Sequence, residues 1–264
     1  MNPPGFPTIP CALTIAGSDS GGGAGIQADL KTFQSLGVHG LTVITCITAQ
    51  NPDKVAGVRE IPPTMVRQQL EAVESYFAPE CVKIGMLYSV PVIHEVSLYL
   101  ARKKEAFVVL DPVMISTSGR ALLSTKAIDC LVQEIVPHCS LLTPNLPEAE
   151  YLLKKQLSSR ERIKSAVREL HDKFGCFVLL KGGHSASSTE VIDIYWDGQT
   201  EDILSSPRIK NVQTHGTGCT YASAICAKMA TKPEIKTAIR EAHSFVHEAI
   251  KHSVQSGRAT LLHW

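Results

Sequence analysis

Long runs of charged residues of one sign are absent from this sequence of 264 residues, in which 26 Lys and Arg stand against 25 Asp and Glu. The even balance argues against nucleic acid or an anionic membrane as a partner. No apolar run is long enough to cross a bilayer, and the start of the chain lacks the basic region and apolar core of a signal peptide. We therefore expect a cytoplasmic protein that binds small molecules.

A CxxC pair is also absent, although the chain has eight cysteines. Their spacing is irregular and most lie inside apolar runs, which is typical of reduced, buried thiols and unlike a disulfide framework or a zinc site. The cysteines are Cys11, Cys46, Cys81, Cys130, Cys139, Cys176, Cys219 and Cys226.

With 44% hydrophobic residues the chain can bury a large core, and one α/β domain is favoured over two small ones. Residues 1–9 are rich in proline and are predicted to form a flexible N-terminal arm. No linker or repeat divides the remainder, so residues 10–264 are predicted to form a single domain.

Short apolar runs alternate with amphipathic helical patterns along the chain. Strands are predicted at 11–16, 41–48, 81–86, 106–111, 139–143, 176–181 and 191–196. Helices are predicted at 26–36, 63–77, 91–103, 124–136, 158–174, 218–230 and 233–254. Strands that are apolar along their whole length indicate a mostly parallel sheet covered by helices on both faces.

Two glycine-rich stretches each lead into a predicted helix. The first contains Gly23, Gly25 and Ala28, which fit the dinucleotide fingerprint GxGxxG/A and raise the possibility of an oxidoreductase. That fingerprint needs an acidic residue at the end of the second strand, where this chain has Gln50, so the match is weak. The alternative is a tight turn in which glycine permits close backbone packing.

The second stretch runs from Thr214 to Cys219. Two glycines before a helix leave backbone N–H groups uncovered, and the helix dipole favours an anion at the same place. A thiol at this turn is expected to have a lowered pKa and raised reactivity. The plainer alternative is a glycine turn that starts a helix, with Cys219 as a small buried residue.

Five unusual residues fall at or just past the carboxyl ends of predicted strands: Gln50, Met86, Asp111, Asn145 and Lys181. Because ligands bind at this edge of open α/β sheets, we expect the five to meet in one crevice. Any one of them alone could be an ordinary loop residue.

Several of these residues suit phosphate chemistry. Oxygen atoms of Asp111, Asn145 and Glu148 are of the kind that holds Mg²⁺, and Lys181 followed by Gly182 adds a cation beside a flexible backbone. Together with an anion seat, they describe a site for phosphoryl transfer, without the Walker A sequence of P-loop enzymes. Two alternatives remain, in which Glu148 is only a favourable first-turn carboxylate and Lys181 a surface charge.

The motifs in order resemble those of the hydroxymethylpyrimidine/phosphomethylpyrimidine kinases of thiamin biosynthesis, members of the ribokinase-like superfamily. The segments that carry the resemblance, from about Cys11 to Val254, are 16–19, 22–29, 83–86, 110–114, 143–149, 181–184 and 215–220. The resemblance implies a three-layer αβα sandwich, ATP with Mg²⁺, and often a homodimer. It also implies two successive phosphorylations, from 4-amino-5-hydroxymethyl-2-methylpyrimidine to its monophosphate and then to the diphosphate.

The resemblance also implies roles for individual residues. The substrate would be bound at its polar edge by Asp29 and Gln50 and enclosed by Gly17, Met86 and Val113. Asp111 and Glu148 would hold the metal. The nucleotide phosphates would meet Asn145, Lys181, Gly182 and Thr214. The anion hole would consist of Gly216, Thr217, Gly218 and Cys219, with Cys219 placed against the hydroxymethyl group where most of the superfamily has an aspartate base.

Two rival functions remain besides the oxidoreductase. Some pyridoxal kinases share the cysteine-containing motif, but the side-chain amide of Gln50 favours an aminopyrimidine because it can pair with both a donor and an acceptor. A non-catalytic regulator that senses a vitamin precursor would be expected to have lost phosphate-site residues, whereas Asp111, Glu148 and Lys181 are all present.

Overall fold

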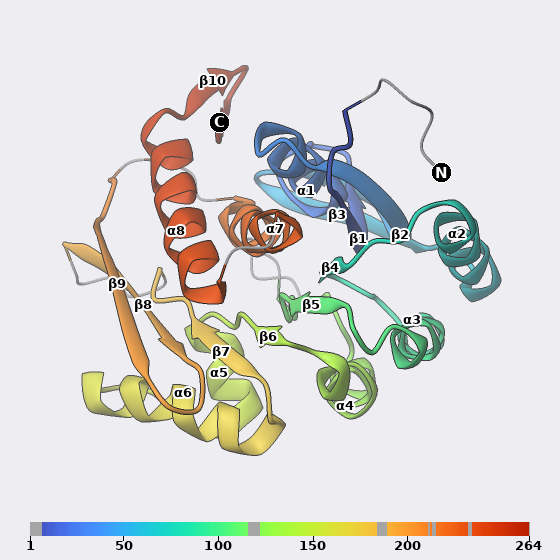
Figure 1. Ribbon diagram of the computed structural model, residues 1–264. Helices are drawn as coiled ribbons and strands as arrows, with labels where there is room; N and C mark the ends of the chain where they lie inside the picture. The colour runs from blue at the N-terminus through green and yellow to red at the C-terminus, as the bar shows by residue number, and fades with distance from the viewer. Residues whose placement is uncertain are drawn as a thin grey trace.

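The computed structural model describes residues 7–115, 122–183, 189–210, 212, 215–231 and 234–263. Its centre is a nine-stranded sheet in the order β3-β2-β1-β4-β5-β6-β7-β8-β9 (Figure 1). The strands are β1 (Cys11–Asp19), β2 (His39–Asn51), β3 (Lys54–Glu60), β4 (Cys81–Ile84), β5 (Phe107–Leu110), β6 (Leu141–Leu142), β7 (Phe177–Leu180), β8 (Glu190–Trp196) and β9 (Glu201–Pro207). A separate antiparallel pair, β10 (Val254–Ser256) and β11 (Ala259–Leu261), follows near the C-terminus.

The sheet is parallel through its middle and antiparallel at both edges. Strands β2, β1, β4, β5, β6 and β7 all pair in parallel. Strand β3 is antiparallel to β2, while β8 and β9 form an antiparallel hairpin beside β7. The carboxyl ends of the six parallel strands therefore lie along one edge of the sheet.

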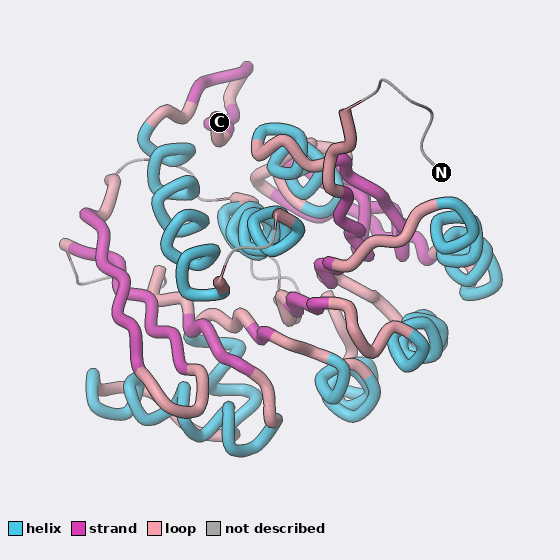
Figure 2. The backbone as a smooth tube through the Cα atoms, viewed as in Figure 1, coloured by secondary structure: helices cyan, strands magenta, loops and turns pink. Residues whose placement is uncertain are grey.

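Helices cover both faces of the sheet (Figures 1 and 2). One face carries α1 (Gly25–Ser35), α7 (Thr217–Ala230) and α8 (Ile235–Lys251). The other carries α2 (Pro63–Tyr76), α3 (Val90–Arg102), α4 (Thr125–Glu134), the 3₁₀ turn η1 (Val136–His138), α5 (Leu146–Leu153) and α6 (Arg160–Phe174). This is the three-layer αβα arrangement that the resemblance implied.

Alternation of side chains along the strands builds two apolar cores, one on each face. In β1, Leu13 and Ile15 pack toward α2 and α3, whereas Ala12 packs toward α1 and α7. Successive side chains of a strand point to opposite faces, so a strand buried on both faces must be apolar throughout. Burial on both faces explains why apolar runs marked these strands in the sequence.

All seven predicted strands are present, but the edge elements were missed. Strands β3 and β9 each bury a single residue, Val55 and Leu204, so neither carries the apolar run that marks the inner strands. The short helix α5 was also missed, since its sequence LPEAEYLL is only eight residues long. The predicted helix at 233–254 begins at Ile235 and ends at Lys251.

Residues 1–6 of the predicted arm lie outside the described residues, and residues 7–9 are exposed. The division into arm and domain stays a prediction. Within the described part of the chain, no helix has both the length and the apolar character needed to span a membrane.

Candidate functional site

A cleft of about 750 Å³ opens at the carboxyl ends of the parallel strands. It brings together all five strand-end residues singled out in the sequence, together with the turn at the start of α7. The predicted site residues that line it are Gly17, Gln50, Met86, Asp111, Val113, Asn145, Glu148, Lys181, Gly216, Thr217, Gly218 and Cys219. Their convergence follows from the parallel strands, whose loops all leave at the same edge.

Asp29 does not line this cleft, and its implied contact with the substrate stays a prediction. Its side chain is fully buried, and both carboxylate oxygens lie about 3 Å from the Lys83 ammonium, at 3.0 and 2.9 Å. The hydroxyl groups of Thr14 and Ser223 each donate to it at 2.6 Å. Asp29 therefore serves as the counter-charge of Lys83 inside the core.

Gly182 also does not line the cleft, whereas the adjacent Gly183 does. The N–H of Gly182 donates to Asp193 Oδ1 at 2.8 Å, and a Cβ at this position would lie 1.9 Å from the carbonyl oxygen of Ile192. Glycine is therefore needed here for the close approach of β7 and β8. Thr214, the other predicted nucleotide contact, lies outside the described residues.

Lys181 stands at the end of β7, beside the start of α7. Its Nζ donates to Asp111 Oδ1 at 2.6 Å and would lie 3.3 Å from a Cβ added to Gly218. Burial lowers the pKa of Lys181, but the carboxylates of Asp111 and Glu148 outweigh it and leave the pKa above its usual value. The ammonium is therefore charged and borders the space above Gly218.

Asn145 and Glu148 form a capping box at the start of α5. The Asn145 side chain accepts from the Glu148 N–H, and the Glu148 carboxylate accepts from the Asn145 N–H, both at 2.9 Å. Burial and the neighbouring charge of Asp111 raise the pKa of Glu148 to about 7, against the opposing effect of Lys181. The structural alternative for Glu148 thus holds, yet the residue also borders the cleft beside Asp111.

The turn before α7 requires glycine at position 216. Gly216 has φ +83° and is the N-cap residue, and a Cβ there would lie 1.7 Å from the carbonyl oxygen of Gly23. Helix α7 begins at Thr217, so its unpaired first-turn N–H groups lie at the residues that border the cleft. This geometry is that of an anion seat.

The expected low pKa of Cys219 is wrong for this structure. Burial, reinforced by the negative charges of Asp29 and Asp111, raises the pKa of the thiol to about 11. The positive charge of Lys83 opposes these effects without overcoming them. Cys219 is therefore a neutral thiol at neutral pH, even though it lies in the first turn of a helix.

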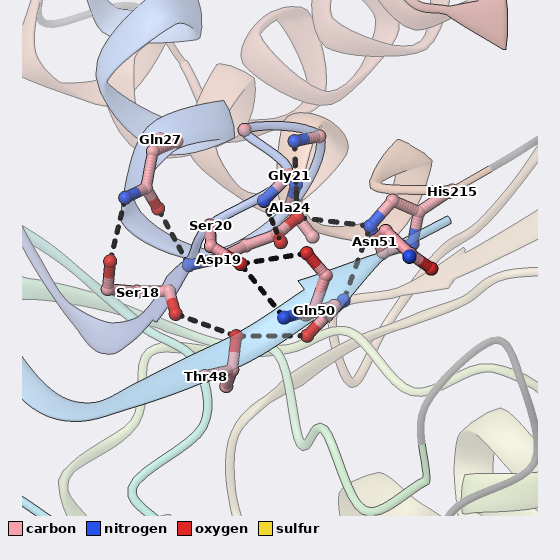
Figure 3. A network of polar contacts seen from close by, with 12 residues as sticks. Ser18, Asp19, Ser20, Gly21, Ala24, Gln27, Thr48, Gln50, Asn51 and His215 are labelled. Carbon is pink, nitrogen blue, oxygen red and sulfur yellow. Dashed lines mark hydrogen bonds and ion pairs between the residues drawn. The ribbon is translucent and has the colours of Figure 1, made fainter. Parts of the chain in front are cut away.

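The cleft also borders a polar network that was not predicted from the sequence (Figure 3). His215 Nε2 lies 3.1 Å from Asp19 Oδ2 and 3.3 Å from Gln50 Nε2. Thr48 Oγ1 lies 3.3 Å from Gln50 Oε1 and donates to the Ser18 carbonyl at 2.9 Å. Asp19 and His215 lie in two of the segments that carry the family resemblance, but their contact joins residues 196 positions apart in the chain and leaves no local pattern.

Lys83 was also missed, although a lysine inside the apolar run of β4 is an unusual feature. It is fully buried and borders the cleft floor. A further part of the lining comes from the β8–β9 hairpin and α8, including Val191, Asp193, Pro207, His243, Val246 and His247. These positions do not follow parallel strands, so the strand-end rule could not have found them.

Comparison with known proteins agrees with the geometry of the site. Residues 19–263 match the family model described as phosphomethylpyrimidine kinase. The chain is 42% identical to a hydroxymethylpyrimidine/phosphomethylpyrimidine kinase of Bacillus subtilis, over 93% of this chain and 91% of that protein. It is 44% identical to the thiamine biosynthesis bifunctional protein ThiED of Geobacter sulfurreducens over 93% of its own length, which is 50% of that longer protein.

A solved structure of a Bacillus subtilis pyridoxal kinase, an ADP complex, has the same fold with a TM-score of 0.89. The two chains are 34% identical, and the match covers 97% of each. The match over residues 19–263 and the identity to the curated kinases settle the relationship: the chain belongs to the phosphomethylpyrimidine kinase family.

Proposed function

We propose that this protein transfers the γ-phosphoryl group of ATP to 4-amino-5-hydroxymethyl-2-methylpyrimidine and then to its monophosphate, giving the diphosphate. The observation that carries the proposal is one cleft lined by two chemically different groups of residues. The substrate end is the part around the Gln50 amide, and the phosphate end is the part around Lys181 and the first turn of α7, which follows directly on the Gln50 contact His215. An aminopyrimidine suits the first end and a polyphosphate the second.

Contacts at the substrate end match a small flat ring. Gln50 offers a donor and an acceptor, the pattern that pairs with an aminopyrimidine edge. Gly17 lets its backbone pack closely against two side chains of the cleft, because a Cβ there would lie 2.7 Å from Cys46 Sγ and 3.8 Å from Met86 Sδ. Met86 and Val113 add apolar surface to the same cleft.

At the phosphate end the chain contributes mainly position and charge. The first-turn N–H groups of α7 and the Lys181 ammonium stabilise negative charge on the transferred group. Cys219 lines the same cleft, but with a pKa of about 11 its thiol is protonated at neutral pH and cannot take up a further proton. The proton of the substrate hydroxyl would pass late to an oxygen of the transferred phosphoryl group, because a loose phosphoryl-transfer transition state requires little early deprotonation.

The acidic groups suit Mg²⁺. Asp111 and Glu148 provide hard oxygen donors at the phosphate end, and no cluster of three His, Cys, Asp or Glu side chains arranged for a metal occurs among the residues described. Mg²⁺ is commonly held by one or two carboxylates with substrate phosphates and water completing its shell. The ion would neutralise charge on the phosphates; Asp111 and Glu148 would hold it there.

The test is product identification by mass spectrometry after incubating the purified protein with ATP, Mg²⁺ and either hydroxymethylpyrimidine or pyridoxal. We expect the pyrimidine monophosphate, then the diphosphate. As a matched pair, Lys181→Met should abolish transfer, whereas Lys155→Met, which removes an exposed ammonium paired with Glu169, should not. Transfer to neither substrate would contradict the proposal.

Pyridoxal kinase is the second candidate because of the structural match to the Bacillus subtilis enzyme. Replacing Gln50 by Met should weaken hydroxymethylpyrimidine binding by roughly 1–3 kcal/mol, the usual cost of leaving a buried polar group unpaired. Pyridoxal binding should change less. Equal weakening of both would favour the second candidate. Homodimer formation and cytoplasmic location stay predictions.

A further inference from the structure

The ring of His215 makes two contacts through one nitrogen. Nε2 lies 3.1 Å from Asp19 Oδ2 and 3.3 Å from Gln50 Nε2 (Figure 3). A ring nitrogen either carries a hydrogen and donates or has a lone pair and accepts. It cannot donate to the carboxylate while accepting from an amide NH₂. If one contact fixes the nitrogen as a donor, the atom in the other contact must be an acceptor.

Asp19 decides it. Its carboxylate already accepts N–H groups from Gly21 at 2.8 Å, Gly23 at 3.1 Å and Ala24 at 2.8 Å. Burial raises its pKa, but the hydrogen bonds from His215 and these backbone groups outweigh burial and hold the pKa below its usual value. An ionised carboxylate only accepts. His215 Nε2 therefore carries a hydrogen and donates to Asp19.

The same hydrogen determines which end of the Gln50 amide faces His215. An NH₂ group there would set two donors against each other, whereas the amide oxygen would accept from Nε2–H. The exchange needs only a half-turn of the terminal torsion. It also suits Thr48, whose hydroxyl hydrogen is used by the Ser18 carbonyl at 2.9 Å and whose lone pair can accept the amide N–H.

We propose that His215, fixed by Asp19, is a positioning residue that sets the polarity of the Gln50 amide and so the orientation in which the substrate edge binds. The inference rests on the proposed function. With its oxygen toward His215 and its nitrogen toward Thr48, the amide retains one free lone pair and one free N–H. The ligand class it selects is a heteroaromatic ring with an exocyclic amine on the His215 side and an adjacent ring nitrogen on the Thr48 side.

The packing of the ring supports a fixed position. Its side chain is 12% exposed, and a Cβ added to Gly23 would lie 2.8 Å from His215 Cδ2. His215 also directly precedes Gly216, the N-cap residue of α7. The residue that orients the Gln50 amide is thus next in the chain to the anion seat. The position of the substrate ring is therefore linked to the site of phosphoryl transfer.

The first test compares two substitutions of His215. Phe keeps the flat ring and removes the donor, while Gln supplies an N–H near the position of Nε2. We expect His215→Phe to raise KM for hydroxymethylpyrimidine roughly tenfold or more, as for an unpaired buried polar group, with a smaller change in kcat. His215→Gln should recover most of the affinity. His94→Phe, an exposed position on α3, is the matched control and should behave as the unmodified protein.

A double-mutant cycle isolates the coupling to Gln50. In a Gln50→Met background, His215→Phe should weaken binding no further, because no amide remains to be oriented. Equal losses in both backgrounds would refute the proposal. Long-range ¹H–¹⁵N NMR of the unmodified protein gives a readout independent of activity: a neutral ring protonated only on Nδ1 would also refute it.

These outcomes are separable from a failure of the proposed function. If the unmodified protein phosphorylates neither substrate, the kinase assignment fails, whereas the NMR spectrum still reports which nitrogen of His215 carries the hydrogen. If the protein is an active pyrimidine kinase and both His215 variants retain the unmodified KM, the positioning role alone fails.

Discussion

Replacement of Asp29 by Asn distinguishes a structural role for this residue from the substrate contact that the family resemblance implied. Asp29 and Lys83 are both fully buried and form an ion pair at 2.9 Å. Removing one partner of a buried pair leaves an uncompensated charge, which typically costs about 3–5 kcal/mol. We expect the free energy of unfolding of Asp29→Asn to fall by that amount.

The contacts around Asp29 show that this cost comes from the charge. The hydroxyl groups of Thr14 and Ser223 can either donate or accept, so each can rotate to satisfy an Asn amide. The Lys83 ammonium can only donate, and it loses the opposite charge that keeps its pKa above the usual value despite burial. Lys83→Met added to Asp29→Asn should therefore restore most of the lost stability, because no buried charge remains.

Urea unfolding followed by circular dichroism measures the effect, provided that the slope of the transition stays constant. Asp53→Asn is the matched control, since its side chain is 69% exposed and its change should stay within about 0.5 kcal/mol. Calorimetry then compares pyrimidine binding by the folded variants. An Asp29→Asn protein with unchanged stability and greatly weakened pyrimidine binding would refute the structural role and restore the substrate contact.

Three further predictions concern the phosphate end. The rate of Cys219 alkylation by iodoacetamide should rise with pH up to about 11, the pKa that burial gives the thiol. A rate that levels off near pH 8.5, about the ordinary pKa of a thiol, would contradict this prediction. The pKa of Glu148 is about 7 in the folded protein against a usual 4.5, so folding takes up a proton between these pH values. The free energy of unfolding should therefore fall as the pH rises from 4.5 to 7. In urea titrations Glu148→Gln should make this fall smaller. Gly216→Ala should destabilise the protein by at least ~2 kcal/mol because of its positive φ and the 1.7 Å approach to Gly23 O, whereas Gly218→Ala should fold normally in urea titrations and lose kcat.

The fold could be predicted wherever burial constrained both faces of an element. Strands such as β5 and β7 lie inside the sheet, so their sequences are apolar without interruption. Edge strands β3 and β9 face solvent on one side and could not be distinguished from loops by the same rule. The two-residue β6 shows the opposite limit, since the strand predicted at 139–143 is longer than the two residues that pair in the sheet.

The site could be predicted only as far as chain direction determines it. Parallel strands fix where Gln50, Asp111 and Lys181 lie, because each follows a strand end. The partners of a side chain are fixed by packing between distant loops, and these contacts leave no local pattern. For that reason both the ion pair of Asp29 with Lys83 and the contact of His215 with Asp19 were missed.

The two lysines near the start of α7 differ in whether their positive charge is neutralised inside the core or remains accessible to a ligand in the cleft. Lys83 contacts both oxygens of Asp29 and is completely enclosed, so its charge is neutralised in place. Lys181 contacts one oxygen of Asp111 at 2.6 Å, and its side chain remains 12% exposed beside Gly218. An ammonium has three donors, so Lys181 keeps hydrogen-bonding capacity toward the cleft. A phosphate bound at the α7 N-terminus would thus accept a hydrogen bond from the Lys181 ammonium. Lys83 contributes only a fixed positive potential near Cys219.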